Sequence, residues 1–139
     1  MDKTNPPRTF GVFKPVGHTL IAFKTDADLQ MAVKLLTEAG FANSTFVQYT
    51  PTEMKIQVDS EVKTASPLAG FGYELDLVKA HGELADSGCS FLVVHAPEEA
   101  QAESVATVAR TTNAVTAQHY GTFMIEDILT PPPGGNAAP

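Results

Sequence analysis

The chain has 139 residues, which suits one domain with a sizeable core, and its apolar fraction of 43% argues against a disordered body. Nine Lys and Arg against sixteen Asp and Glu give a net charge of -7, which argues against binding to nucleic acid or to an anionic membrane surface. The single Cys89 excludes an internal disulfide, and no uninterrupted apolar run is longer than the four residues Phe91 to Val94, so no membrane-spanning helix is expected.

The two ends of the chain differ in composition from its middle. Residues 1–9 and the Pro- and Gly-rich residues 130–139 are typical of a flexible arm and a flexible tail. We therefore expect one folded domain over residues 10–129. The N-terminal sequence MDKTNPPRTF has no apolar stretch that could act as a signal peptide, so we expect a cytoplasmic protein.

The folded part is predicted to begin with a strand and a helix. Residues Gly17 to Lys24 (GHTLIAFK) are rich in apolar and β-compatible side chains and predict the strand. Thr25 with Asp28 three positions later forms an acidic variant of the capping box, which predicts a helix start. Gly40 provides the stop for this helix.

A second strand and an amphipathic helix follow. Thr45 to Tyr49 (TFVQY) predicts the strand. Thr50, Pro51 and Glu53 then supply an N-cap, a first-turn proline and an acidic third residue, a combination typical of a helix start.

The next helix is expected over Ser66 to Gly88 (SPLAGFGYELDLVKAHGELADSG), because Ser-Pro is a start signal and glycine a stop signal. Three glycines, Gly70, Gly72 and Gly82, lie inside it, and each costs about 0.5–1 kcal/mol relative to alanine. We interpret them as sites of close helix packing. A ligand pocket or a break in the helix are the alternatives.

The last part of the chain predicts a strand, a helix and another strand. Cys89 to His95 (CSFLVVH) is the strand, Pro97 to Glu99 open the helix, and Asn113 closes it. Val115 to about Met124 forms the fourth strand, with a bulge or bend at a glycine. Ile125 to Leu129 either extends this strand or folds back over the core.

This order, β-α-β-[α-α]-β-α-β, predicts an α+β fold of the ferredoxin-like sandwich type, with a four-stranded, mainly antiparallel sheet. The runs LIAF (20–23) and FLVV (91–94) are apolar at both strand parities, so both sheet faces should be buried. The helical insert at about 51–87 can cover the second face, or two chains can stack or exchange the insert. We therefore expect a homodimer or a higher even oligomer.

Three stretches carry a resemblance to a known family: YTPTEM (49–54), ELDLVKAH (74–81) and HYGTFMIEDIL (119–129). With the order of elements, they resemble a family of small, uncharacterised bacterial cytoplasmic proteins, distantly similar in βαβ pattern to the heat-induced general stress protein domains. The resemblance covers most of residues 17–129 and implies a stress-related or regulatory role, with no active-site residues. Those domains often have a glycine-rich apolar middle segment, whereas this chain has charged helices there.

Candidate chemical groups do not form a known motif. The four histidines lack metal-binding spacing, and a structural or solvent-exposed role is expected for each: His18, His81, His95 and His119. The Gly-x-Gly at 70–72 lacks the third glycine of a dinucleotide fingerprint, since that position is Leu75. We therefore predict no catalytic residue, no metal and no cofactor.

The functional expectation is a non-catalytic protein that acts through self-association or partner binding, without nucleic acid. The alternative is a small-molecule sensor or an enzyme, with a pocket between the inserted helices and the sheet. Tyr49, Tyr73 and His81 are the residues expected to line that pocket.

Overall fold

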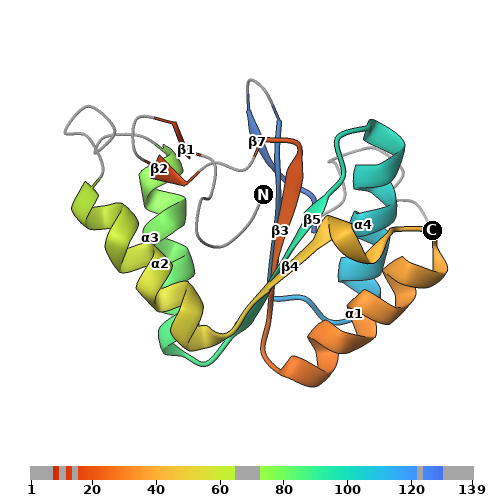
Figure 1. Cartoon of the computed structure of the whole chain (residues 1–139), viewed down its shortest axis with the longest axis horizontal. Coiled ribbons are helices and arrows are strands. Elements are labelled where there is room, and N and C mark those ends of the chain that lie inside the picture. Colours follow the sequence, from red (N-terminus) through yellow and green to blue (C-terminus); the bar gives the residue numbers. More distant parts are fainter. Residues whose placement is uncertain (1–7, 10–11, 14–15, 65–72, 122–123, 130–139) are drawn as a thin grey trace.

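An antiparallel sheet runs through the structure, with helices on both of its faces (Figure 1). The computed structural model describes residues 8–9, 12–13, 16–64, 73–121 and 124–129. In these residues the sheet contains five strands: β3 (His18–Phe23), β4 (Phe46–Tyr49), β5 (Ser90–His95), β6 (Thr116–Tyr120) and β7 (Ile125–Asp127). The helices are α1 (Asp26–Glu38), the 3-10 turn η1 (Asn43–Thr45), α2 (Pro51–Thr64), α3 (Tyr73–Asp86) and α4 (Glu99–Thr111).

The strand order is β4-β5-β3-β6-β7, and every neighbouring pair is antiparallel. The α+β class and the antiparallel sheet are thus confirmed. The predicted sheet of four strands is corrected to five in the described residues. The predicted fourth strand ends at Tyr120, because the Gly121 N–H donates to the Met124 carbonyl at 2.8 Å and the chain turns back. Residues Ile125–Asp127 then pair with β6 as the edge strand.

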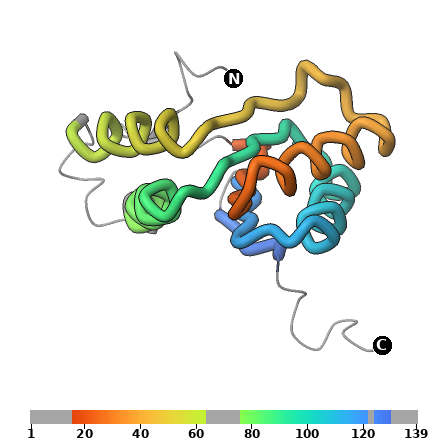
Figure 2. The backbone as a smooth tube through the Cα atoms, turned by 90° about the horizontal axis from the view of Figure 1, so that it is seen from below, coloured from red at the N-terminus to blue at the C-terminus, as the bar shows by residue number. Residues whose placement is uncertain are grey.

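Both faces of the central strand β3 are buried. This was predicted from its consecutive apolar residues, which point alternately to the two faces. Leu20 and Ala22 belong to a core cluster with residues of α2 and α3. Ile21 and Phe23 belong to a second cluster with residues of α1 and α4. Figure 2 shows the two helix pairs on opposite sides of the strands. The chain therefore covers both faces itself, and burial of the sheet does not require a second chain.

Helix α1 begins and ends at the predicted signals. The Thr25 hydroxyl accepts the Asp28 N–H at 3.1 Å. At the other end Gly40 has φ +103, its N–H donates to the Thr37 carbonyl at 3.0 Å, and the Phe41 N–H donates to the Leu36 carbonyl at 3.0 Å. These two bonds form a Schellman motif, which a glycine at the left-handed position favours.

Helix α2 starts at the predicted N-cap Thr50, and the cap is reciprocal. The Thr50 N–H donates to Glu53 Oε1 at 2.9 Å, and the Glu53 N–H donates to the Thr50 hydroxyl at 3.1 Å. Helix α3 is described from Tyr73, so the predicted start at Ser66 lies outside the described residues. It is followed by Gly88 with φ +96.

The predicted ends of the chain fall mostly outside the described residues. Two residues of the expected arm, β1 (Arg8–Thr9), pair instead with β2 (Val12–Phe13), which contacts α2 and α3. The expected tail, 130–139, lies outside what the structure describes. None of the described helices combines the length and the apolar character that crossing a bilayer requires.

Candidate functional site

His81, one of the predicted pocket residues, is buried between α3 and the sheet, with 2% of its surface exposed. Its ring lies edge-on to Phe91, with centroids 6.0 Å apart, and its Nε2 lies 3.4 Å from Gln118 Oε1, which can only accept a hydrogen bond. Burial lowers the pKa of His81 to about 4, against the opposing effect of the Gln118 bond. His81 is therefore neutral at pH 7 and links α3 to β6.

The structure describes the side chain of one of the other two predicted pocket residues, Tyr49, but not that of Tyr73. Tyr49 is buried on β4 and pairs with Phe91 in the register of β4 and β5. Tyr49 and His81 thus both lie next to Phe91, on the sheet face that α2 and α3 cover. Tyr73 is the first residue of α3, and its side chain lies outside the described part of the structure. A ligand role for these three residues stays a prediction.

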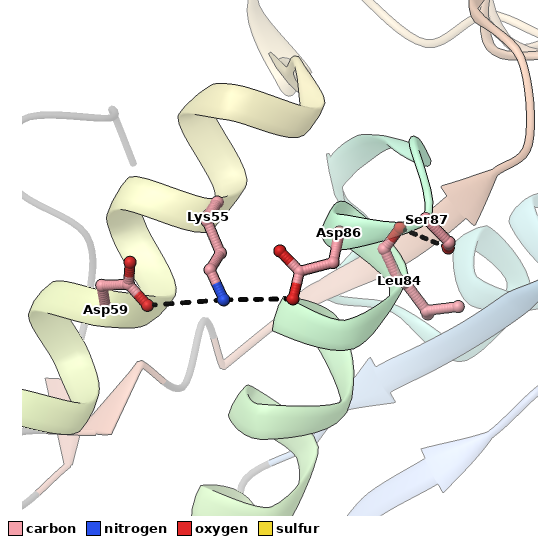
Figure 3. Close-up of polar contacts among 5 residues, drawn as sticks. All are labelled: Lys55, Asp59, Leu84, Asp86 and Ser87. Carbon is pink, nitrogen blue, oxygen red and sulfur yellow. Dashed lines mark hydrogen bonds and ion pairs between the residues drawn. The ribbon is translucent and has the colours of Figure 1, made fainter.

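Gly82 lies where α3 packs on α2. A Cβ at this position would be 2.9 Å from Val58 Cγ1, closer than Cβ atoms approach other side chains in proteins. On the exposed side of the same helix pair, Lys55 Nζ lies 3.2 Å from Asp86 Oδ2 and 3.7 Å from Asp59 Oδ1 (Figure 3). Gly70 and Gly72 lie outside the described residues, and the packing role of all three glycines stays a prediction.

The remaining histidines lie at one end of the sheet. His119 is half-buried, with Nδ1 2.9 Å from the Thr19 hydroxyl, and burial lowers its pKa while Glu126 partly opposes the change. His18 and His95 face each other across β3 and β5, with ring centroids 4.7 Å apart. In the described residues no group of three or more His, Cys, Asp or Glu side chains is placed to hold a metal ion.

A groove of about 500 Å³ lies between the end of α1 and the start of α4, where the sequence pattern predicted no site. Two chain segments line it, residues 39–45 and residues 95–104. The lining residues are Ala39, Gly40, Phe41, Ala42, Thr45, His95, Pro97, Glu98, Ala100, Gln101 and Ser104. This lining includes no residue of α2 or α3, so the groove is distinct from the predicted pocket.

Local backbone geometry fixes both walls of the groove. The Schellman motif at Gly40 turns the chain out of α1 and directs Phe41 and Ala42 along one wall. On the other wall Glu98 caps α4: its side chain accepts the Gln101 N–H, and its own N–H donates to Gln101 Oε1 at 3.0 Å. Both walls are therefore held by backbone hydrogen bonds before any ligand arrives.

His95 is the residue that β5 contributes to the groove lining. Its exposed ring lies against His18, and a Cβ at Gly17 would be 3.9 Å from its Cε1. Gly17 has φ +81, donates its N–H to the Tyr120 carbonyl at 2.7 Å and accepts the Ala96 N–H at 2.9 Å. These bonds place the turn before β3 beside the end of β5, and so fix the position of His95.

Comparisons with known proteins do not assign the groove or the buried layer a role. No protein-family model matches the chain, and no curated protein or solved structure is significantly similar to it. The resemblance to stress protein domains stays a prediction, and the site has to be interpreted from its own residues.

Proposed function

We propose that the protein is a non-catalytic binding protein, and that the groove between α1 and α4 is its binding site. The observation that carries the proposal is a cavity of about 500 Å³, since small-molecule sites usually occupy about 300–1,000 Å³. Its lining combines apolar surface, from Phe41, Pro97 and three alanines, with polar groups from η1, the end of β5 and the start of α4. This mixture is typical of sites that bury an apolar body and orient it by a few hydrogen bonds.

The rigidity of the polar groups also supports binding. Glu98 and Gln101 each hold a backbone N–H of the other, which fixes both side chains without a ligand. A preformed site loses less side-chain entropy when a ligand binds. A sensor of a small molecule, which the sequence offered as an alternative with a pocket elsewhere, is the role that this arrangement favours.

The topology supports a ferredoxin-like core within the five-stranded sheet. Strands β4, β5, β3 and β6 follow the order of two interlocked split βαβ units, and α1 and α4 pack on the same face. In this arrangement the end of α1 meets the start of α4, which creates the groove. The fold hosts many functions, so the choice depends on the site.

The net charge supports the cellular setting that we propose. A net charge of -7 favours a soluble protein that binds neither nucleic acid nor an anionic membrane, and the N-terminal sequence without an apolar stretch favours the cytoplasm. A stress-related or regulatory role belongs to the same proposal, through the family resemblance.

Occupation of the groove can be tested by blocking it. We expect amide signals of Gly40, Phe41 and Gln101 to shift in a ¹H–¹⁵N NMR screen of a small-molecule library. Ala100→Trp should abolish these shifts, because Ala100 is an exposed groove residue. Thr107→Trp is the matched control: it is exposed on the same stripe of α4 but does not line the groove. Ligands that bind elsewhere, or equal binding by both variants, would contradict the proposal.

Self-association is the second candidate, and one observation favours it. Val16 is 43% exposed and Met124 is 61% exposed. Val16 precedes β3 and Met124 precedes the edge strand β7, and both strands start at the same end of the sheet. Edge strands with apolar neighbours can pair between chains. Native mass spectrometry should then show a homodimer or higher even oligomer that Met124→Glu dissociates, whereas a monomer at micromolar concentration excludes this candidate.

A further inference from the structure

The hydroxyl groups in the groove already donate their protons in hydrogen bonds to backbone carbonyls of the protein. Ser104 Oγ donates to the Ala100 carbonyl at 3.1 Å, and Thr45 Oγ1 donates to the Ala42 carbonyl at 2.6 Å. A hydroxyl has one proton and two lone pairs, so each of these groups presents acceptor sites to the groove. Both hydroxyls therefore favour a ligand that donates hydrogen bonds.

The capping pair on α4 adds further acceptors. Glu98 accepts one backbone N–H from Gln101, which leaves most of the roughly four acceptor sites of its carboxylate for a ligand. Gln101 Oε1 accepts the Glu98 N–H and keeps a second lone pair. The Gln101 amide nitrogen and the His95 ring are the side-chain donors of the lining. Side-chain acceptors thus outnumber side-chain donors on this wall.

The charge of the groove also favours a ligand that donates hydrogen bonds, in particular a cation. Glu98 is the charged residue of the lining, which contains no Lys or Arg. Ala39 and Gly40 bring the C-terminal end of α1 to the groove, and a helix C-terminus carries partial negative charge that no basic residue in the last turn of α1 offsets. At the N-terminus of α4, which would otherwise attract an anion, the Glu98 carboxylate already accepts the Gln101 N–H.

We propose that the groove binds a small organic cation that carries an ammonium or guanidinium group on an aliphatic body. The inference rests on the proposed function, in which the groove is the binding site. The charged N–H donors pair with Glu98, Ser104 and Thr45. The aliphatic body packs on Phe41, Pro97 and the alanines that line the rest of the groove. An anion of the same size would meet the Glu98 carboxylate.

Three four-carbon probes that differ in charge test this inference directly. The full-length protein is titrated with 1,4-diaminobutane, 1,4-butanediol and succinate at constant ionic strength, with amide shifts followed by NMR. We expect 1,4-diaminobutane to shift Gly40, Phe41, Gln101 and Ser104, with an affinity at least about tenfold higher than that of the diol. Succinate should leave these amides unchanged.

Removal of one charge gives the second measurement. Glu98→Gln keeps an oxygen that can cap α4 but removes the negative charge, so diamine affinity should fall by about tenfold. Glu103→Gln removes the same charge from an exposed position of α4 outside the groove, and should change the affinity less than twofold. The melting temperatures of both variants show whether the fold is retained.

The outcomes separate this inference from the proposed function. If the diol or succinate shifts the groove amides as strongly as the diamine does, or if Glu98→Gln binds the diamine like the wild type, the ligand class is wrong and the groove remains a binding site. If no probe shifts these amides, the library screen decides: a cationic ligand in the groove supports the inference, whereas a neutral or anionic one overturns it. If no ligand occupies the groove, both proposals fail.

Discussion

The two helix layers place similar side chains in opposite environments. Between α3 and the sheet, His81 and Gln118 lie in a buried layer, and burial lowers the pKa of His81 to about 4. Between α1 and α4, His95 and Gln101 line an open groove. The first pair joins structural elements, while the second remains accessible to a ligand. Residue type alone therefore does not identify a site, because solvent access decides which chemistry the same groups can perform.

The largest expected effect concerns the pH dependence of stability. The pKa of His81 is lowered from 6.5 to about 4 on folding, so the unfolded chain binds a proton more readily. The associated stability is complete above pH 6.5 and is lost as the pH falls toward 4. Between pH 7.5 and pH 4 this loss amounts to about 3 kcal/mol. Urea unfolding at both pH values measures it.

Two variants compare the layers in the same experiment. His81→Gln removes the titrating group. The change in its unfolding free energy between pH 7.5 and pH 4 should therefore be about 3 kcal/mol smaller than that of the wild type. His95→Gln is the control, because it makes the same substitution at an exposed residue of the groove. If both variants show the same pH dependence of the unfolding free energy, the two histidines do not lie in different environments.

The next effect concerns packing. Gly82→Ala places a Cβ 2.9 Å from Val58 Cγ1, and we expect a loss of about 1–2 kcal/mol in unfolding free energy, even though alanine favours helix formation. In a Val58→Ala background the same change should cost less, because the obstructing methyl groups are absent. A double-mutant cycle by chemical denaturation measures this coupling. A stabilising Gly82→Ala would show that the helices are not in close contact.

The smallest effect uses the two glycines that end α1 and α3. Gly40 and Gly88 have φ +103 and +96, and a Cβ at either would meet no atom within 4 Å. Alanine at either should therefore cost about 1 kcal/mol through backbone strain alone. NMR should separate them: Gly40→Ala shifts amides of the groove, and Gly88→Ala those at the start of β5. Groove amides that respond equally to both would argue against the groove's dependence on the α1 end.

Local signals predicted the helix ends well. The Thr25 and Thr50 caps and the stop at Gly40 depend on residues within five positions, so the sequence contains the whole interaction. The edge strand β7 is different. Its pairing with β6 depends on a chain reversal after Gly121 that the apolar run around it does not specify.

The groove could not be found from the sequence for a similar reason. Its walls lie at least fifty residues apart along the chain, and neither has a motif. The topology contains the one available signal: two split βαβ units set the end of α1 beside the start of α4. Polar residues at those two ends, Thr45 and Glu98, would have been the candidates.

The position of β3 in the sheet has a consequence for how the chain folds. This strand, His18–Phe23, is the first of the main sheet to be synthesised, yet it lies at the centre and pairs with β5 and β6. Neither partner exists until the ribosome has passed residue 89. Its apolar run Leu20–Phe23 must therefore wait for both strand partners, while the helices α1, α2 and α3, which share core clusters with it, precede β5 in the chain. Such long-range pairing slows folding and exposes a strand edge to aggregation, so the nascent chain is most vulnerable before β5 emerges.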